Sequence, residues 1–221
     1  KPPIRYTLED GVRFLLGFLD ALGVERAALV GNSMGGTVAL KTALDCPERV
    51  SRIALVATAG LGKQVAWFVR LASLPLAGEL LEEPSRARSR ILLQNLVHDP
   101  TAITPDLVEE LYNARRQPGG KQAVLKTIRW SVNLWGVKRG AILLDQLPRL
   151  RVPLLILWGA QDRILPVAHA YQAQRLLPSA RLVVFDGCGH LPQMEKGEEF
   201  LRHLTGFLEE DLPPDPPAPR P

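Results

Sequence analysis

The 221-residue sequence has little of what disulfide frameworks, metal centres and membrane spans require. Its only cysteines are Cys46 and Cys188, which form no Cys-x-x-Cys pair, and it has just four histidines. It contains no run of 18 apolar residues and no signal-peptide core. We therefore expect a reducing, cytoplasmic setting, no contact with a membrane, and no metal ion or other cofactor.

Clustered charge is also scarce. The net charge of +4 is spread along the chain, aromatic residues make up 6% of it, and the one basic cluster, Arg86, Arg88 and Arg90, lacks interleaved aromatics. Such a cluster is typical of a solvated helix face, which argues against nucleic acid as a partner. With 46% hydrophobic residues the chain can bury a sizeable core. A small-molecule substrate is the expected partner, and no oligomeric state is predicted.

What the sequence does contain is a turn of small residues with one serine, directly after an apolar run. The turn residues are Gly31, Asn32, Ser33, Met34 and Gly35. A Gly-x-Ser-x-Gly pattern suits a sharp strand-to-helix turn, where the serine backbone is strained and its flanks must be small. The turn would raise the serine oxygen beside the free N–H groups of a helix N-terminus. We interpret Ser33 as a catalytic nucleophile.

The alternative is that this turn merely joins a strand to a helix. A bare match to the pattern in a chain of this length has a chance of about one in ten, so the context decides. An apolar run at 27–30 precedes the turn, and a helical pattern at 37–44 follows it, as the motif requires.

Apolar runs and helical patterns alternate along most of the chain and predict an α/β fold. Strands are expected at 27–30, 53–57, 153–158 and 182–185, and helices at 7–23, 37–46, 167–177 and 198–208. A strand, a crossover helix and a strand imply parallel pairing, so the fold is a mostly parallel sheet flanked by helices. The two later strands are so apolar that we expect both of their faces to be buried.

The chain divides into a discontinuous core, an insertion and a tail. Residues 1–58 and 152–211 form the predicted core, and residues 59–151 are far longer than a parallel crossover requires. The insertion has amphipathic helical patterns as far as Leu134 and Trp135, and we predict a helical cap over Ser33. Most of its large apolar residues should pack between helices, and a few should face the site. The proline-rich residues 212–221 are predicted to be a disordered tail.

A serine nucleophile needs a base, and the base needs a carboxylate that orients it. Asp162 follows the strand at 153–158, and His190 follows the strand at 182–185. Loops that follow parallel strands emerge at one edge of the sheet, so both side chains should lie near Ser33. Asp186 is the competing carboxylate, but it ends the strand itself, so we favour Asp162.

The remaining candidates are predicted to be structural. His98 lies in the insertion, His169 in the helix after Asp162, and His203 in the last helix, so each is interpreted as a surface or packing histidine. Cys188 has no second thiol nearby and is interpreted as a small filler of the core.

Three motifs, at 31–36, 157–166 and 187–195, make residues 6–208 resemble the α/β-hydrolase family. By this resemblance the nucleophile is Ser33, the general base and acid is His190, the orienting carboxylate is Asp162, and one oxyanion donor is the backbone N–H of Met34. The resemblance also implies strands and a His-Gly-type oxyanion loop before the first helix. The sequence has no His-Gly dipeptide, so we expect a fragment lacking about 60 N-terminal residues. The strand ending at Val30 would then lie at an open edge of the sheet.

The resemblance implies a carboxylesterase-like serine hydrolase that cleaves a small ester or related acyl substrate through an acyl-enzyme. The alternative is a carbon–carbon bond hydrolase of aromatic meta-cleavage products, in which the motif at 31–36 is common. That branch usually has Trp where Leu191 follows the base, and Arg where Leu111 precedes Tyr112, although Arg115 lies about one turn further on. A third hypothesis, from another class, is a non-catalytic, ligand-binding member of the fold. The missing oxyanion loop supports this hypothesis.

Overall fold

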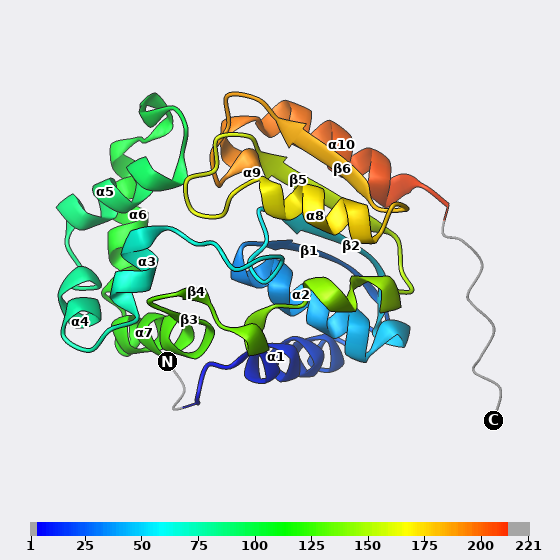
Figure 1. Ribbon diagram of the computed structural model, residues 1–221, viewed down its shortest axis with the longest axis horizontal. Helices are drawn as coiled ribbons and strands as arrows, with labels where there is room; N and C mark the ends of the chain where they lie inside the picture. Colours follow the sequence, from blue (N-terminus) through cyan, green and yellow to red (C-terminus); the bar gives the residue numbers. More distant parts are fainter. Residues whose placement is uncertain (1–3, 212–221) are drawn as a thin grey trace.

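A four-stranded parallel sheet lies at the centre of the protein. The structure is a computed structural model that describes residues 4–211 (Figure 1). The strand order is β1-β2-β5-β6, and the strands are β1 (Ala27–Asn32), β2 (Val50–Val56), β5 (Leu154–Gly159) and β6 (Arg181–Phe185). All three pairings are parallel. The predicted α/β fold with a mostly parallel sheet is confirmed.

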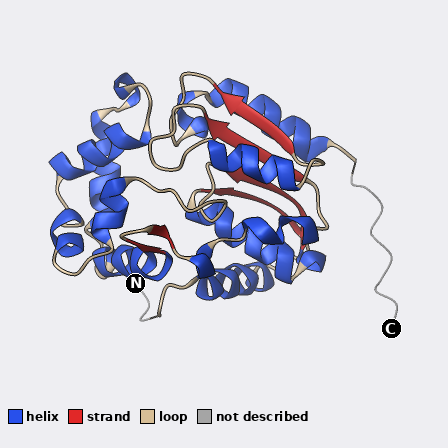
Figure 2. Ribbon diagram, viewed as in Figure 1, coloured by secondary structure: helices blue, strands red, loops and turns tan. Residues whose placement is uncertain are grey.

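Helices cover both faces of the sheet (Figures 1 and 2). Helices α2 (Met34–Asp45) and α8 (Ala168–Leu176) cover the first face, and α1 (Leu8–Ala21) packs against α2. Helix α10 (Gly197–Glu209) covers the second face. Alternation along the strands separates two apolar clusters. Ile53 and Leu55 face α2 and α8, whereas Ala54 and Val56 face α10. This is the period of two expected of strands that are covered on both sides.

The first helix begins where its sequence predicts. Thr7 Oγ1 accepts a hydrogen bond from Asp10 N at 3.2 Å, and Asp10 Oδ2 accepts one from Thr7 N at 3.2 Å. This capping box satisfies two N–H groups at the start of α1, which buries Leu8, Val12 and Leu19.

The two outer strands are less covered than the inner ones. Every residue of β5 is buried, as predicted, but β6 has an exposed first residue and only one buried residue. The prediction that both late strands are buried on both faces is therefore wrong for β6, because in the described sheet it pairs with β5 alone. At the other edge of the described sheet, Ala28 and Val30 of β1 are exposed. An open edge at Val30 is what the sequence predicts.

Residues 59–151, called the insertion below, are mostly helical (Figure 2). They include α3 (Trp67–Ala72), α4 (Ala77–Leu81), α5 (Arg86–Leu96), α6 (Pro105–Arg115), α7 (Gly120–Ser131) and the strands β3 (Val132–Asn133) and β4 (Gly136–Val137). The insertion also contains the short elements η2 (Pro100–Ala102), η3 (Arg139–Ala141) and η4 (Leu144–Arg149), and outside it lie η1 (Pro47–Arg49) and α9 (Pro192–Glu195). Helices α3 to α7 of the insertion lie at the carboxyl ends of the strands, on the left of Figure 1.

The helical pattern predicted through Leu134 and Trp135 is wrong at its end. These two residues form the turn of the β3–β4 hairpin, where Asn133 Oδ1 accepts a hydrogen bond from Trp135 N at 2.9 Å. Helix α7 has already ended at Ser131, because Val132 is extended with φ −130° and ψ 151°. Gly136 follows Trp135 with φ +115°, a conformation that favours glycine. Trp135 is left 79% exposed.

The predicted disordered tail at 212–221 lies outside the described residues. Within residues 4–211, every helix is too short or too polar to cross a membrane.

Candidate active site

Ser33 lies in the sharp turn between β1 and α2. Its backbone has φ 53° and ψ −120°, a left-handed conformation that is strained for a residue with a side chain. Ser33 N donates to Val56 O at 2.9 Å, and Ser33 O accepts from Ala59 N at 3.2 Å. Strand β2 and the segment that follows it therefore hold the turn in place. The predicted strand–turn–helix context of the serine is present.

The steric role of the glycines differs in part from the prediction. A Cβ atom on Gly31 would lie 2.4 Å from Gly35 O, so Gly31 is required for the turn. A Cβ on Gly35 would meet nothing within 4 Å, whereas one on Gly36 would lie 2.1 Å from Thr58 Oγ1. The positions that cannot hold a side chain are thus Gly31 and Gly36, because Gly36 packs against the end of β2.

The predicted base and its orienting carboxylate are paired. His190 Nδ1 lies 2.8 Å from Asp162 Oδ2, and the two side chains are 3% and 0% exposed. Asp162 Oδ1 accepts from the backbone N–H groups of Ile164 and Leu165 at 2.8 and 3.0 Å. One carboxylate oxygen thus fixes the aspartate and the other holds Nδ1 of the imidazole, which leaves Nε2 for proton transfer.

The loop of His190 is joined to the turn of Ser33 by Asn32. Asn32 Nδ2 donates to Val56 O at 3.1 Å and to His190 O at 3.3 Å. No hydrogen bond joins Ser33 Oγ to His190 Nε2 in the part of the chain that the structure describes. Met34 is the first residue of α2, so its N–H has no acceptor within the helix and can serve an oxyanion.

The competing residues have other partners. Asp186 Oδ1 accepts from Gln161 Nε2 at 2.8 Å, and this hydrogen bond lowers the pKa of the exposed carboxyl. His169 is buried against Trp158 and its Nε2 lies 2.9 Å from Gln64 Oε1; burial lowers its pKa. Cys188 is fully buried, and burial raises the pKa of its thiol to about 12. None of these three has the environment of a nucleophile or a base.

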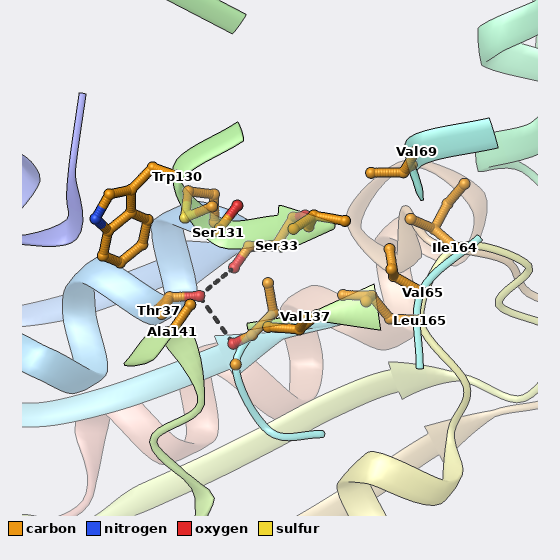
Figure 3. A pocket seen from close by; sticks show the side chains of 14 residues that line it. Ser33, Thr37, Val65, Val69, Trp130, Ser131, Val137, Ala141, Ile164 and Leu165 are labelled. Carbon is orange, nitrogen blue, oxygen red and sulfur yellow. Dashed lines mark hydrogen bonds between the residues drawn. The ribbon is translucent and has the colours of Figure 1, made fainter. Parts of the chain in front are cut away.

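A cavity of about 160 Å³ adjoins Ser33 (Figure 3). It lies between the core and the insertion, which contributes Trp130 among other side chains. Its walls are Ser33, Met34, Thr37, Ala59, Gly60, Val65, Val69, Trp130, Ser131, Val132, Val137, Ala141, Ile164 and Leu165. This set contains no charged residue, so the cavity suits an apolar group beside the serine oxygen. Among residues 4–211, no group of three or more His, Cys, Asp or Glu is placed to hold a metal ion.

Comparisons with known proteins place this geometry in a family. The sequence model of the alpha/beta hydrolase fold matches residues 1–197. A 2-hydroxy-6-oxo-6-phenylhexa-2,4-dienoate hydrolase of Comamonas testosteroni is 35% identical over 198 residues, which are 89% of this chain and 67% of that protein. This chain thus spans about two thirds of that relative's length.

Solved structures agree with the sequence match. A meta-cleavage product hydrolase from Pseudomonas fluorescens IP01 has a TM-score of 0.76 and 28% identity, and the match covers 94% of this chain and 74% of that one. A bacterial membrane phospholipase A has a TM-score of 0.77 and 27% identity, over 95% of this chain and 65% of that one. The chain belongs to the alpha/beta hydrolase family, and its relatives are hydrolases.

Proposed function

We propose that this chain carries the Ser33, His190 and Asp162 triad of a hydrolase that cleaves a carbon–carbon bond in a 2-hydroxy-6-oxo-dienoate. The observation that carries the substrate class is the 35% identity to a hydrolase of such a compound over 89% of the chain. It favours the carbon–carbon alternative over the ester hydrolysis that we first expected. The geometry around Ser33 supports the serine-hydrolase class itself.

The proposed reaction begins at the 6-oxo carbon. Ser33 Oγ attacks this carbon while His190 Nε2 accepts the hydroxyl proton, and Asp162 stabilises the imidazolium through Nδ1. The oxyanion accepts a hydrogen bond from Met34 N–H. When it collapses, the bond between C5 and C6 breaks. Its electron pair is delocalised only if C5 is saturated, so the substrate reacts as its 2,6-dioxo tautomer, in which the proton of the 2-hydroxyl group has moved to C5. The electron pair then forms the dienolate of the leaving fragment.

His190 then returns the proton to the leaving fragment. The other fragment remains as an ester on Ser33 Oγ. Water attacks this acyl-enzyme with His190 again as the base, which releases a carboxylic acid and restores the serine. The proton transfers of acylation and of deacylation use the same imidazole nitrogen, so a single base suffices for both.

Ester hydrolysis is the second candidate, and the cavity favours it. No charged side chain lines the cavity beside Ser33 to pair with a dienoate carboxylate. The phospholipase A with a similar fold is named for cleavage of an ester. An ester needs the same nucleophile, base and oxyanion donor, and differs only in that the leaving group is an alcohol.

A paired assay tests the proposal. The protein and its Ser33→Ala variant are each assayed with two kinds of substrate. One is 2-hydroxy-6-oxo-6-phenylhexa-2,4-dienoate, whose cleavage is measured as a loss of dienoate absorbance, and the other is a set of short p-nitrophenyl esters. We expect Ser33-dependent turnover of the dienoate to exceed that of the esters. Turnover of esters alone would establish the second candidate, and failure of a fluorophosphonate to label Ser33 would establish the non-catalytic alternative.

A further inference from the structure

Glu195, at the end of α9, connects two segments that are almost a hundred residues apart. Its Oε1 accepts a hydrogen bond from Gly189 N at 2.8 Å, directly before the base. Its Oε2 accepts from His98 N at 2.6 Å and from Asp99 N at 3.4 Å, in the insertion. Each oxygen of one carboxylate therefore serves a different segment. An ionised carboxylate, which has only acceptors, fits these three donors.

The same two segments meet in a second hydrogen bond. His190 N donates to Leu96 O at 2.7 Å. Leu96 is the last residue of α5, so its carbonyl oxygen is one of those that a helix leaves without an internal partner. The backbone of the base thus satisfies the C-terminus of a helix in the insertion.

The contact is too close for any side chain at position 189. A Cβ atom on Gly189 would lie 2.7 Å from Leu96 O and 2.8 Å from His98 N. The backbone of the His190 loop therefore contacts the backbone of residues 96–99 closely. This contact lies next to the proposed catalytic pair, because Gly189 immediately precedes His190, whose side chain is hydrogen-bonded to Asp162.

We propose that Glu195 is a positioning residue that sets the orientation of His190 by tying its loop to residues 96–99 of the insertion. This inference rests on the proposed role of His190 as the base. A displacement of residues 96–99 reaches the imidazole through Gly189 N and His190 N. The placement of the insertion and the alignment of the base are consequently coupled. A misplacement of about 1 Å in a catalytic group can cost on the order of 100-fold in rate.

Two variants and one control test this role. Glu195→Ala removes both carboxylate oxygens, and with them the hydrogen bonds to Gly189 N and to residues 98–99. Glu195→Gln retains one acceptor oxygen but presents an NH₂ group to the N–H donor on the other side. Glu198→Gln is the matched control, because it removes the same charge from an exposed side chain three residues later. Circular dichroism establishes which variants fold; if Glu195→Ala does not, Glu195→Gln carries the test.

The decisive readout is the ¹H NMR signal of the hydrogen-bonded Nδ1 proton of His190, assigned by its loss in Asp162→Asn. This signal reports the His190–Asp162 geometry and requires no turnover. We expect it to shift or broaden in the Glu195 variants and to be unchanged in Glu198→Gln. The rate of fluorophosphonate labelling of Ser33 should fall roughly 10- to 100-fold in parallel.

The outcomes separate this inference from the proposed function. An unchanged Nδ1 signal in a folded Glu195→Gln protein would overturn the positioning role, whatever the activity. A changed signal with unaltered labelling of Ser33 would also overturn it, since Glu195 would then support the fold alone. If the signal changes but the unsubstituted protein is never labelled, the positioning role stands and the proposed function fails.

Discussion

The side-chain amide of Asn32 lies 3.3 Å from the carbonyl oxygen of His190, and so joins the turn of Ser33 to the loop of His190. The same amide also bonds Val56 O. We predict that Asn32→Ala lowers the free energy of unfolding by about 1–2 kcal/mol, because His190 O loses this donor and Val56 O keeps only the bond from Ser33 N. Urea denaturation measures this, with Asn95→Ala, whose amide makes one exposed bond, as the control. Equal losses in the two variants would contradict a special role for Asn32.

The triad should behave as one unit. We expect Ser33→Ala and His190→Ala each to reduce turnover roughly a thousandfold or more, and Asp162→Asn somewhat less. Because each residue acts through the others, the double variant Ser33→Ala/His190→Ala should be scarcely worse than either single one. Steady-state kinetics of all four variants provides the measurement. Losses that multiply in the double variant would argue that Ser33 and His190 act separately.

Two neighbouring glycines should differ sharply. Gly36→Ala places a Cβ 2.1 Å from Thr58 Oγ1 and 2.8 Å from Gly31 O, so we expect it to cost about 1–3 kcal/mol of stability. Gly35→Ala meets open space inside α2 and should be neutral or stabilising by up to about 1 kcal/mol, because alanine loses less freedom in a helix. Thermal unfolding compares them. A similar loss in both would contradict this account of the turn.

Stability should depend on pH through His169. Burial lowers its pKa below the ordinary value of 6.5, and its buried Nδ1 has no hydrogen-bond partner within residues 4–211, so the folded protein holds the ring neutral. The unfolded chain therefore binds the proton first as the pH falls. Above about pH 6.5 the protonation of His169 does not lower the free energy of unfolding. As the pH falls from there to the lowered pKa of the folded state, the free energy of unfolding decreases.

Urea denaturation at pH 5.5 and 7.5 tests this effect of His169. The difference between the two pH values should be smaller in His169→Gln than in the unsubstituted protein. His203→Gln is the control, because that ring is partly exposed on α10. A pH dependence that persists undiminished in His169→Gln would assign it to other groups.

The edge strand β1 should promote self-association. Val30 is 47% exposed on a strand that has a neighbour on only one side in the described sheet. Unpaired strand edges beside apolar side chains invite pairing with a second chain, and a lysine there opposes it. We predict that Val30→Lys lowers the mass measured by light scattering at high protein concentration. Phe14→Lys, at an equally apolar but helical site, should have a smaller effect; the reverse order would place the association elsewhere.

The sequence by itself determined those features whose physical cause is local. Buried strands need continuous apolar runs, so the four parallel strands could be predicted from 27–30, 53–57, 153–158 and 182–185. The capping box at Thr7 and the serine turn also depend on residues close in the chain. The pairing of Asp162 with His190 could be anticipated as well, because parallel topology alone brings the loops after successive strands to one edge.

Only the tertiary structure decided the features that depend on distant segments. Gly36 is crowded because Thr58 arrives there from the end of β2, which no spacing around the serine reveals. The edge position of β6 exposes it although its residues are apolar. Glu195 meets His98 across 97 positions of sequence. Hydrogen bonds and steric limits act over a few ångströms, so contacts between such distant residues exist only once the insertion has folded against the core.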